Sequence, residues 1–426
     1  MYELAEKLFP ICRSIMGEGT RETLRIVRDE YMPDMEIINV PCGTKVFDWT
    51  IPNEWVIRDA YIANSRGEKI IDFKENNLHV VGYSYPVDEY VDLEELKKHI
   101  YVEEQDEDAI PYVTSYYVKR YGFCMTMKQR DSLPEDTYHM YIDSEFKTGE
   151  EGGVLSIGEV LIPGESEQEI FFSTYDCHPS MCNDQLSGIC TMTEVYKYIK
   201  SMPRRRYSYR LIIIPETIGS ITYLSKNIDV MKKNIIAGFN MTCVGDNLDY
   251  SYVQTKYADT LADKVIANVL KYHYPDYHAY SFLKRGSDER QYCAPGVELP
   301  VVAFCRSKFG EFPEYHTSKD NLSFISEEGL QGAYEVMRQC IDALEANYYY
   351  RVKCLCEPQL GKRGLFPTIS KRGSYNAIQV MTHFITYADG RNDIIDISNI
   401  IGAPVSEIIP IAKTLLENDL IEVVER

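Results

Sequence analysis

His178 and Asp184 are the first residues in this 426-residue chain whose types and spacing could support chemistry. They lie in a polar turn after an apolar, strand-like run, within the sequence FFSTYDCHPSMCNDQLSG from Phe171 to Gly188. An imidazole and a carboxylate placed together at the end of a strand can supply half of a zinc site, because Zn²⁺ accepts nitrogen and oxygen ligands. The remaining ligands must come from elsewhere in the chain.

Three further groups also follow apolar, strand-like runs. Glu216 comes directly after LIIIP, Asp246 closes GFNMTCVGD, and His316 lies in EFPEYHTSKDNL a few residues beyond a run. A lone His or Asp is more often a hydrogen-bonded structural residue than a ligand, but such groups at four successive strand ends indicate a site. Since sites in α/β sheets form at the carboxyl ends of strands, we expect the four positions to converge.

A hydrolytic zinc centre would need these residue types. Such a centre keeps one coordination position open for water, whose pKa the metal lowers to ~7. A carboxylate that is not a ligand can then take the proton from the water and return it to the leaving amine. Glu216 suits that role.

The elements that must position these groups alternate between helix and strand after residue 184. We expect helices at 188–202, from 220, at 259–274 and at 326–350, and strands at 209–215, 235–243 and 299–305. This alternation predicts a layered α/β domain with a mixed, largely parallel central sheet.

Changes of pattern divide the chain into domains. Residues 1–40 and 110–352 are expected to form the main domain, and residues 41–109 a small inserted β-rich domain, since they alternate β-branched and polar residues between turn signals. Beyond a linker with glycines and prolines, residues 368–426 read as helix, helix, turn, helix and strand. That order is the outline of a winged helix-turn-helix.

Four motifs together resemble the zinc aminopeptidases related to bacterial leucyl aminopeptidase and the transferrin-receptor group, and more closely an aminopeptidase-like bacterial family with an inserted β domain and a C-terminal winged helix. HPSMCNDQLSG resembles the family's metal-binding His followed by Asp-x-x-Ser-Gly, PETIGS its Glu-Glu-x-Gly, RGSDERQYCAPGVELPVV its Ser-Asp-His segment, and YHTSKDNL its Tyr-His-Thr-x-x-Asp ending. The resemblance covers residues 171–325 and implies a three-layer zinc-exopeptidase fold, with Glu216 as general base.

Departures from the family pattern bear on the number of metal ions. The second glutamate of the family's pair is Thr217 here, and another ligand position is Thr242. Asp246, four residues beyond Thr242, is either a substitute ligand through a shift in the loop or a turn residue. One zinc ion is therefore preferred over two, held by His178, Asp184 and His316.

Residues near the same motifs are candidates for contact with a substrate. Tyr315 is expected to pack beside the site, because it directly precedes His316. Asp288 and Arg285 are candidates for lining the pocket, with a surface salt bridge as the simpler account of that pair.

Composition restricts the partners. A net charge of -20 argues against nucleic acid as a general partner, because phosphates repel an acidic surface. From Thr368 to Arg426 the sequence has five Lys/Arg and eight Asp/Glu, so we expect the winged helix to bind protein or to self-associate.

The absence of an 18-residue apolar run and of a signal-peptide pattern predicts a cytoplasmic protein without membrane contact. Its twelve cysteines are expected to be reduced and mostly buried.

These features predict a zinc-dependent exopeptidase that cleaves the N-terminal residue from a peptide, or a similar amide. Two alternatives remain open at this stage. One is amide chemistry on a non-peptide substrate, such as deacylation of a modified sugar or aminoacyl cyclisation. The other is a degenerate peptidase scaffold that acts as a binding or regulatory protein.

Overall fold

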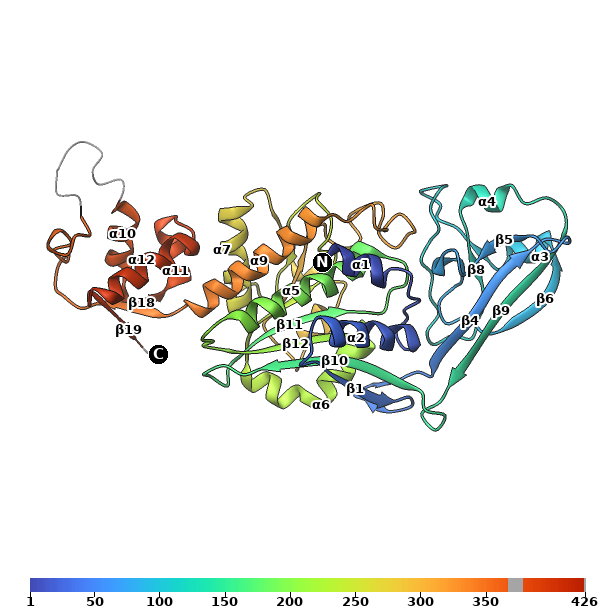
Figure 1. The fold of residues 1–426 in the computed structure, drawn as a ribbon, viewed down its shortest axis with the longest axis horizontal. Helices are drawn as coiled ribbons and strands as arrows, with labels where there is room; N and C mark the ends of the chain where they lie inside the picture. The colour runs from blue at the N-terminus through green and yellow to red at the C-terminus, as the bar shows by residue number, and fades with distance from the viewer. Residues whose placement is uncertain (367–377, 425–426) are drawn as a thin grey trace. The chain divides into compact units, whose positions relative to one another are not determined.

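An eight-stranded mixed sheet forms the centre of the larger part of the chain in the computed structural model (Figure 1), which describes residues 1–366 and 378–424. The strand order is β1-β10-β12-β11-β13-β16-β14-β15. These strands are β1 (Glu36–Pro41), β10 (Val154–Ile162), β11 (Glu169–Tyr175), β12 (Ser208–Ile214), β13 (Ile235–Met241), β14 (Ser251–Val253), β15 (His278–Tyr280) and β16 (Val301–Cys305).

Parallel pairing lies in the middle of this sheet. β11 pairs in parallel with β12 and β13, and β13 with β16, whereas β1, β10 and β14 form antiparallel pairs. Every residue of β11 is buried, as expected of a central strand covered on both faces. The carboxyl ends of the four parallel strands therefore meet at one edge of the sheet.

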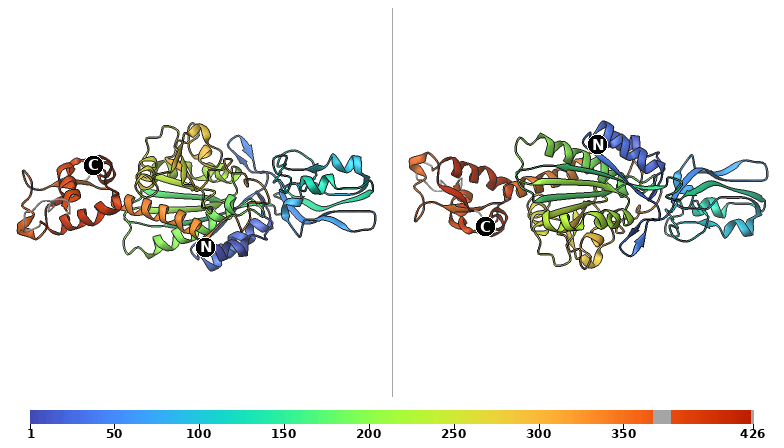
Figure 2. Two further views of the ribbon diagram at one scale, coloured as in Figure 1. Left: turned by 90° about the horizontal axis from the view of Figure 1, so that it is seen from above. Right: turned by 90° about the horizontal axis from the view of Figure 1, so that it is seen from below.

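Helices cover both faces of the sheet (Figure 2). α1 (Tyr2–Leu8), α2 (Glu18–Glu30) and α5 (Ser187–Ser201) lie on one face, and α6 (Ile218–Asn234) lies on the other. A π-helical turn, η2 (Cys182–Leu186), leads into α5. The predicted α/β architecture of three layers is confirmed.

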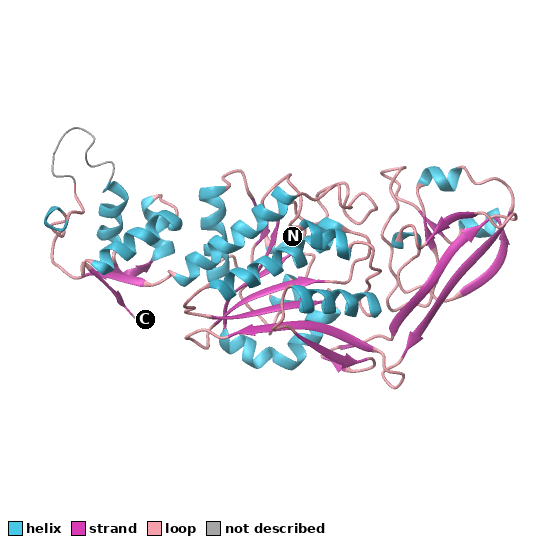
Figure 3. Ribbon diagram, in the orientation of Figure 1, coloured by secondary structure: helices cyan, strands magenta, loops and turns pink. Residues whose placement is uncertain are grey.

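A second, antiparallel sheet of strand order β5-β4-β9-β6 forms the β-rich insert (Figure 3). Because β9 pairs with both β4 and β6, the insert extends beyond residue 109, the boundary expected from the sequence. Pairing between strands that are distant in the chain leaves no local sequence pattern. The boundary predicted at residue 109 was therefore too early. The insert and its approaches contain β2 (Lys45–Val46), β3 (Trp49–Thr50), β4 (Glu54–Ala63), β5 (Lys69–Asp72), β6 (Val87–Asp92), α3 (Leu93–Lys97), β7 (Ile100–Tyr101), β8 (Phe123–Cys124), α4 (Met127–Asp131) and β9 (Thr137–Lys147).

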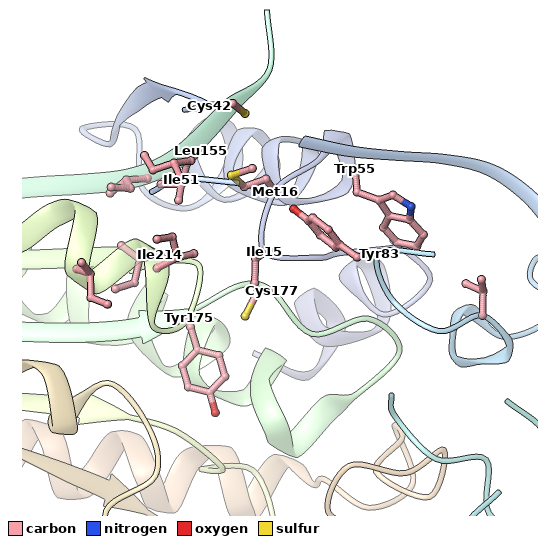
Figure 4. Packing of buried hydrophobic residues seen from close by; sticks show 14 of the residues in the cluster. Ile15, Met16, Cys42, Ile51, Trp55, Tyr83, Leu155, Tyr175, Cys177 and Ile214 are labelled. Atoms are coloured by element: carbon pink, nitrogen blue, oxygen red, sulfur yellow. The ribbon is translucent and has the colours of Figure 1, made fainter. Parts of the chain in front are cut away.

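One hydrophobic cluster joins the insert to the main sheet (Figure 4). It contains Trp55 and Tyr83 from the insert, Ile15 from the segment between α1 and α2, and Tyr175 and Cys177 at the end of β11. The rings of Trp55 and Tyr83 stack with centroids 5.7 Å apart. Burial of this apolar surface fixes the insert beside the edge at which the parallel strands end.

Residues 258–279 and 335–426 form a second compact unit. β17 pairs with β18 and β19 in a three-stranded sheet, so the winged-helix region begins before residue 368, the expected start, which itself lies outside the described residues. The elements here are α7 (Leu261–His273), the end of α9 (Glu327–Glu345), β17 (Tyr349–Val352), α10 (Gln379–Tyr387), β18 (Asp389–Asp393), α11 (Ile394–Ile401), α12 (Val405–Glu417) and β19 (Ile421–Val424).

All twelve cysteines are free, and all except Cys12, Cys354 and Cys356 are buried, which confirms the expected mostly buried thiols. Within the described ranges, no single helix is long and apolar enough to cross a membrane, whereas the bent pair α11 and α12 meets that test by length and composition alone.

Candidate metal centre

Three of the predicted ligands converge at the carboxyl edge of the parallel strands. His178 follows β11, Asp184 lies in the π-helical turn η2, and His316 lies in the long loop after β16. One ligand atom from each side chain lies within 4.8 Å of the other two. Nε2 of His316 is 3.0 Å from Oδ2 of Asp184, and Nε2 of His178 is 3.9 Å from the same oxygen.

The state of these atoms fits a cation. Oδ2 of Asp184 and Nε2 of His316 are buried and lie 3.0 Å apart, and neither forms a well-aligned hydrogen bond with the other or with any other described group. Burial lowers the pKa of His178 to about 4, so its imidazole is neutral and able to bind a metal at neutral pH. Although burial opposes ionisation, the two imidazoles hold the pKa of Asp184 at about 2. Two imidazoles and one carboxylate form a donor set typical of zinc.

Residues that the sequence reading did not assign to the site hold Asp184 in place. The hydroxyl of Tyr175 donates to Oδ1 of Asp184 at 2.5 Å and shares a second hydrogen bond, also 2.5 Å, with Oγ1 of Thr242. Asp320 accepts the backbone N–H groups of residues 182, 183 and 184 at 3.1, 2.6 and 2.8 Å. Partners of this kind fix the orientation of metal ligands.

Backbone strain is concentrated at the same edge. Ser180, Thr217, Cys243 and His316 have positive φ angles of 47°, 65°, 52° and 56°. Non-glycine residues in this region each cost about 1–3 kcal/mol and persist only where their surroundings enforce them. Thr217 is the most unusual of the four, because its side chain is β-branched.

Glu216 follows β12 and lines the same pocket as the two histidines. Burial, together with the neighbouring carboxylates of Asp288 and Asp184, raises the pKa of Glu216 well above its ordinary value. Burial also raises the pKa of Asp288 to about 6. A cation bound at the three ligand candidates would offset this excess of negative charge and favour the ionised form of Glu216.

The pocket has a volume of about 350 Å³. Four aromatic side chains form much of its wall: Trp49, Tyr112, Tyr116 and Tyr117. Trp49 and Tyr117 are 41% and 57% exposed, and their rings meet edge to face with centroids 5.9 Å apart. The insert therefore supplies an aromatic wall beside the ionisable groups.

Tyr315 and Asp288, two predicted substrate contacts, lie close to this site. The ring of Tyr315 stacks on that of His316 with centroids 3.9 Å apart and an interplanar angle of 14°. Oδ1 of Asp288 accepts from the backbone N–H of Thr217 at 2.8 Å and from the hydroxyl of Ser220 at 2.7 Å. Asp288 therefore supports the strained residue beside Glu216.

Arg285 and Asp246 do not join the site. Arg285 is exposed, donates to the carbonyl of Phe282 and is absent from the described lining of the pocket, where Arg290 lies instead. Asp246 is fully buried, and both of its oxygens accept hydrogen bonds from other groups: Asn183 Nδ2, Ser307 N, Ser307 Oγ and Leu248 N. Of the two readings of Asp246, this environment favours the turn residue.

Solved structures share this architecture. The zinc aminopeptidase BSAP from Bacillus subtilis matches with a TM-score of 0.58 at 14% identity, over 80% of this chain and 93% of that one. The fold is therefore that of the aminopeptidases. The crystal structure of a "putative peptidase" from Clostridium acetobutylicum matches with a TM-score of 0.92 at 44% identity, over 99% of this chain and 96% of that one.

Sequence comparisons give the family. The family model described as "Domain of unknown function (DUF4910)" matches residues 2–347, and a winged helix-turn-helix model matches residues 347–423. A Clostridium acetobutylicum protein named "Putative polysaccharide biosynthesis protein with aminopeptidase-like domain" is 45% identical over 426 residues, which is 100% of this chain and 96% of that protein. This chain belongs to the DUF4910 family and carries a C-terminal winged helix-turn-helix.

Proposed function

We propose that this protein is a zinc-dependent aminopeptidase that hydrolyses the N-terminal peptide bond of a small peptide, or a similar amide, in the cytoplasm. One observation carries the proposal: the convergence of His178, Asp184 and His316 within 4.8 Å, in the same pocket as Glu216. Oδ2 of Asp184 and Nε2 of His316, which are buried and make no well-aligned hydrogen bond, support a bound cation there.

His178, Asp184 and His316 would hold the metal, and Tyr175 and Asp320 would keep Asp184 oriented. A zinc ion held there would supply a Lewis acid that polarises a carbonyl group and makes water more acidic. Glu216 takes the proton from the attacking water and returns it to the nitrogen of the leaving amine. The aromatic wall would cover part of a bound substrate and reduce its contact with bulk water, which strengthens electrostatic interactions within the pocket.

The proposal takes one zinc ion rather than two. Thr217 and Thr242 stand where the resemblance places further carboxylate ligands, and both hydroxyls are engaged by protein groups. Oγ1 of Thr217 accepts from Arg290, and Oγ1 of Thr242 shares a hydrogen bond with Tyr175. The hydrogen bonds of Asp246 leave it as a turn residue rather than a substitute ligand.

An amide-substituted sugar is the second candidate substrate. The name of the Clostridium acetobutylicum relative refers to polysaccharide biosynthesis, and the exposed rings of Trp49 and Tyr117 provide apolar surface at the pocket for the face of a pyranose. Both candidates require the same hydrolytic centre, so assays of amino-acid release and of deacylation on the same preparation separate them.

We assign protein contact or self-association to the winged helix. Within α12, Lys413 is the single basic residue, beside Glu407 and Glu417, so this helix offers little attraction to phosphates.

Replacement of Glu216 by glutamine tests the catalytic proposal. The substitution keeps the size of the side chain and removes the base, so we expect kcat for peptide hydrolysis to fall by about 10²- to 10⁴-fold, while one zinc per chain is retained. Metal analysis and release of free amino acids provide the two measurements. Glu89→Gln, an exposed change in the insert, is the matched control and should keep full activity.

Two results would contradict the proposal. A protein that binds no zinc at neutral pH would remove the metal-dependent reaction and favour the degenerate binding scaffold. Zinc-loaded Glu216→Gln with undiminished kcat would remove Glu216 from its role as base.

A further inference from the structure

Arg290 is a cation inside the candidate active-site pocket. It belongs to the short helix α8 (Glu289–Tyr292), which follows the turn that contains Asp288. Among the described residues that line the pocket, Arg290 is the one lysine or arginine and Glu216 the one carboxylate. Its guanidinium is half-buried, so solvent screens it less than a surface charge.

The protein leaves most of this guanidinium without an acceptor. Nη2 of Arg290 donates to Oγ1 of Thr217. In the described parts of the chain the side chain forms no ion pair within 4.0 Å, although its charge favours the ionised forms of Glu216 and Asp288. Its Nε is buried and lacks a hydrogen-bond partner. A guanidinium has five N–H donors, and a buried donor without an acceptor is costly.

The neighbouring carboxylates direct their hydrogen bonds elsewhere. Oδ1 of Asp288 accepts from Thr217 and Ser220, and Oε1 of Glu289 accepts from the backbone N–H groups of Gly286 and Ser287. The second oxygens, Oδ2 of Asp288 and Oε2 of Glu289, are buried without a hydrogen-bond partner, so neither carboxylate is bonded to Arg290. Arg290 therefore faces the pocket with donors that a bound anion could use. Guanidinium groups bind carboxylates through paired N–H donors, which makes this the fitting ligand chemistry.

The other residues of the pocket restrict which kind of molecule can carry that anion. Glu216 is the one carboxylate in the described lining, and the proposed reaction uses it as base, so Arg290 is left to bind a charged part of the substrate. The volume of about 350 Å³ lies near the lower end of the ~300–1,000 Å³ typical of small-molecule sites. A small amide that bears an anionic group matches both features.

We infer that Arg290 binds the free carboxylate of the leaving amino acid, so that the substrate class is an N-acylated amino acid, including a dipeptide. This inference rests on the proposed function and narrows it. Hydrolysis breaks the C–N bond and forms a C–O bond from water, and Glu216 passes the proton of the water to the nitrogen. The carboxylate on Arg290 stays ionised throughout, and its role is to position the scissile bond beside Glu216.

Matched substrates test this role. The zinc-loaded protein is assayed with a dipeptide and its carboxamide, and with an N-acetylated amino acid and its carboxamide. We expect the free carboxylates to be preferred by about 10- to 100-fold in kcat/KM, mainly through KM, because a charge-assisted hydrogen bond is lost in the carboxamides. Arg290→Gln should abolish this preference, and Arg290→Lys should restore part of it.

The control for loss of a positive charge is Arg285→Gln. Arg285 lies five residues earlier, is exposed and is not among the residues that line the pocket, so this variant should keep the wild-type preference. A merely structural role for Arg290 predicts something different: Arg290→Gln would then slow carboxylate and carboxamide substrates by the same factor.

Failure of this inference can be separated from failure of the proposed hydrolysis. If the wild type cleaves both members of each pair equally well, Arg290 does not select a carboxylate, although the hydrolytic function stands. If no substrate is cleaved, calorimetric binding of the N-acetylated amino acid and its carboxamide to the zinc-loaded protein replaces the rate assay. Equal affinities there, or affinities unaffected by Arg290→Gln, would overturn the inference.

Discussion

Tyr175 connects the predicted ligand Asp184 to one of the two threonines that replace carboxylates. Its hydroxyl lies 2.5 Å from both Oδ1 of Asp184 and Oγ1 of Thr242, and its ring belongs to the core cluster at the end of β11. This single side chain therefore both packs the core and leaves Oδ2 of Asp184 directed at the two histidines. A rigid position for the carboxylate lowers the entropic cost of binding an ion.

Replacement of Tyr175 by phenylalanine should weaken the metal site while the fold is retained. The change removes one hydroxyl and leaves Oδ1 of Asp184 without its donor, so we expect zinc affinity to fall by about 10- to 100-fold. Competition with a chromogenic chelator measures the affinity. Tyr90→Phe, at a tyrosine that is 71% exposed on the insert, controls for the loss of a hydroxyl. Unchanged zinc affinity in Tyr175→Phe would show that Asp184 is held without this hydrogen bond.

At the scale of single residues, the sequence predicted some members of the candidate site and missed others. His178, Asp184 and His316 were recognisable because imidazole and carboxylate groups after apolar strands are uncommon and chemically specific. Tyr175 was not, since a tyrosine inside an apolar strand has the pattern of a core residue. Arg290 was also missed, because the sequence analysis chose Arg285 instead. The turn and short helix between these two arginines decide which of them enters the pocket, and no residue pattern predicts that geometry.

At the scale of elements, Asp320 connects two loops that carry ligands. It lies four residues after His316, and its carboxylate accepts three successive backbone N–H groups at the start of η2, the last from Asp184 itself. Burial raises the pKa of Asp320 to about 7, while these three donors favour the ionised form. The loop after β16 and the turn before α5 are thereby held in one arrangement.

Asp320→Asn should loosen this connection. The new amide presents donors to backbone N–H groups, so at least one buried N–H loses its acceptor, and we expect the metal-free protein to lose about 1–3 kcal/mol of unfolding free energy. Zinc affinity should fall as well, because Asp184 is one of the residues released. Urea unfolding and chelator competition measure the two effects.

Asp246→Asn is the matched control for that experiment. Asp246 is also buried and accepts backbone N–H groups, but it lies outside the ligand group. We expect a similar loss of stability with zinc affinity unchanged. A marked loss of zinc in Asp246→Asn would instead return Asp246 to the set of ligands.

The sequence predicted elements better where the evidence for them was local. The alternation of helix and strand after residue 184 predicted the positions of β12, β13 and β16, since each has its own apolar run. The insert was bounded too early because β9 pairs with β4 and β6, and the winged-helix sheet was bounded too late because β17 joins it from before the linker. Pairing of this kind depends on tertiary structure.

At the scale of the whole molecule, the chain carries a net charge of -20, yet we expect its pocket to bind an anion. The same field that we expect to disfavour nucleic acid should also repel a free carboxylate on its approach, and Arg290 offsets this field only inside the pocket. Salt screens charges in solvent over a Debye length of ~30 Å at 0.01 M and ~8 Å at 0.15 M, but it screens a half-buried pair much less. Added salt should therefore weaken the repulsion more than the attraction.

This difference predicts an unusual response to ionic strength. Between ~0.01 M and ~0.15 M salt, we expect kcat/KM for an N-acetylated amino acid to rise by about two- to fivefold relative to its carboxamide, because only the former is repelled by the protein. The carboxamide measured in parallel controls for effects of salt on the metal centre and on folding. A fall in the ratio would mean that the local field at the pocket mouth is positive, and that the surface around the site attracts anions in spite of the net charge of the chain.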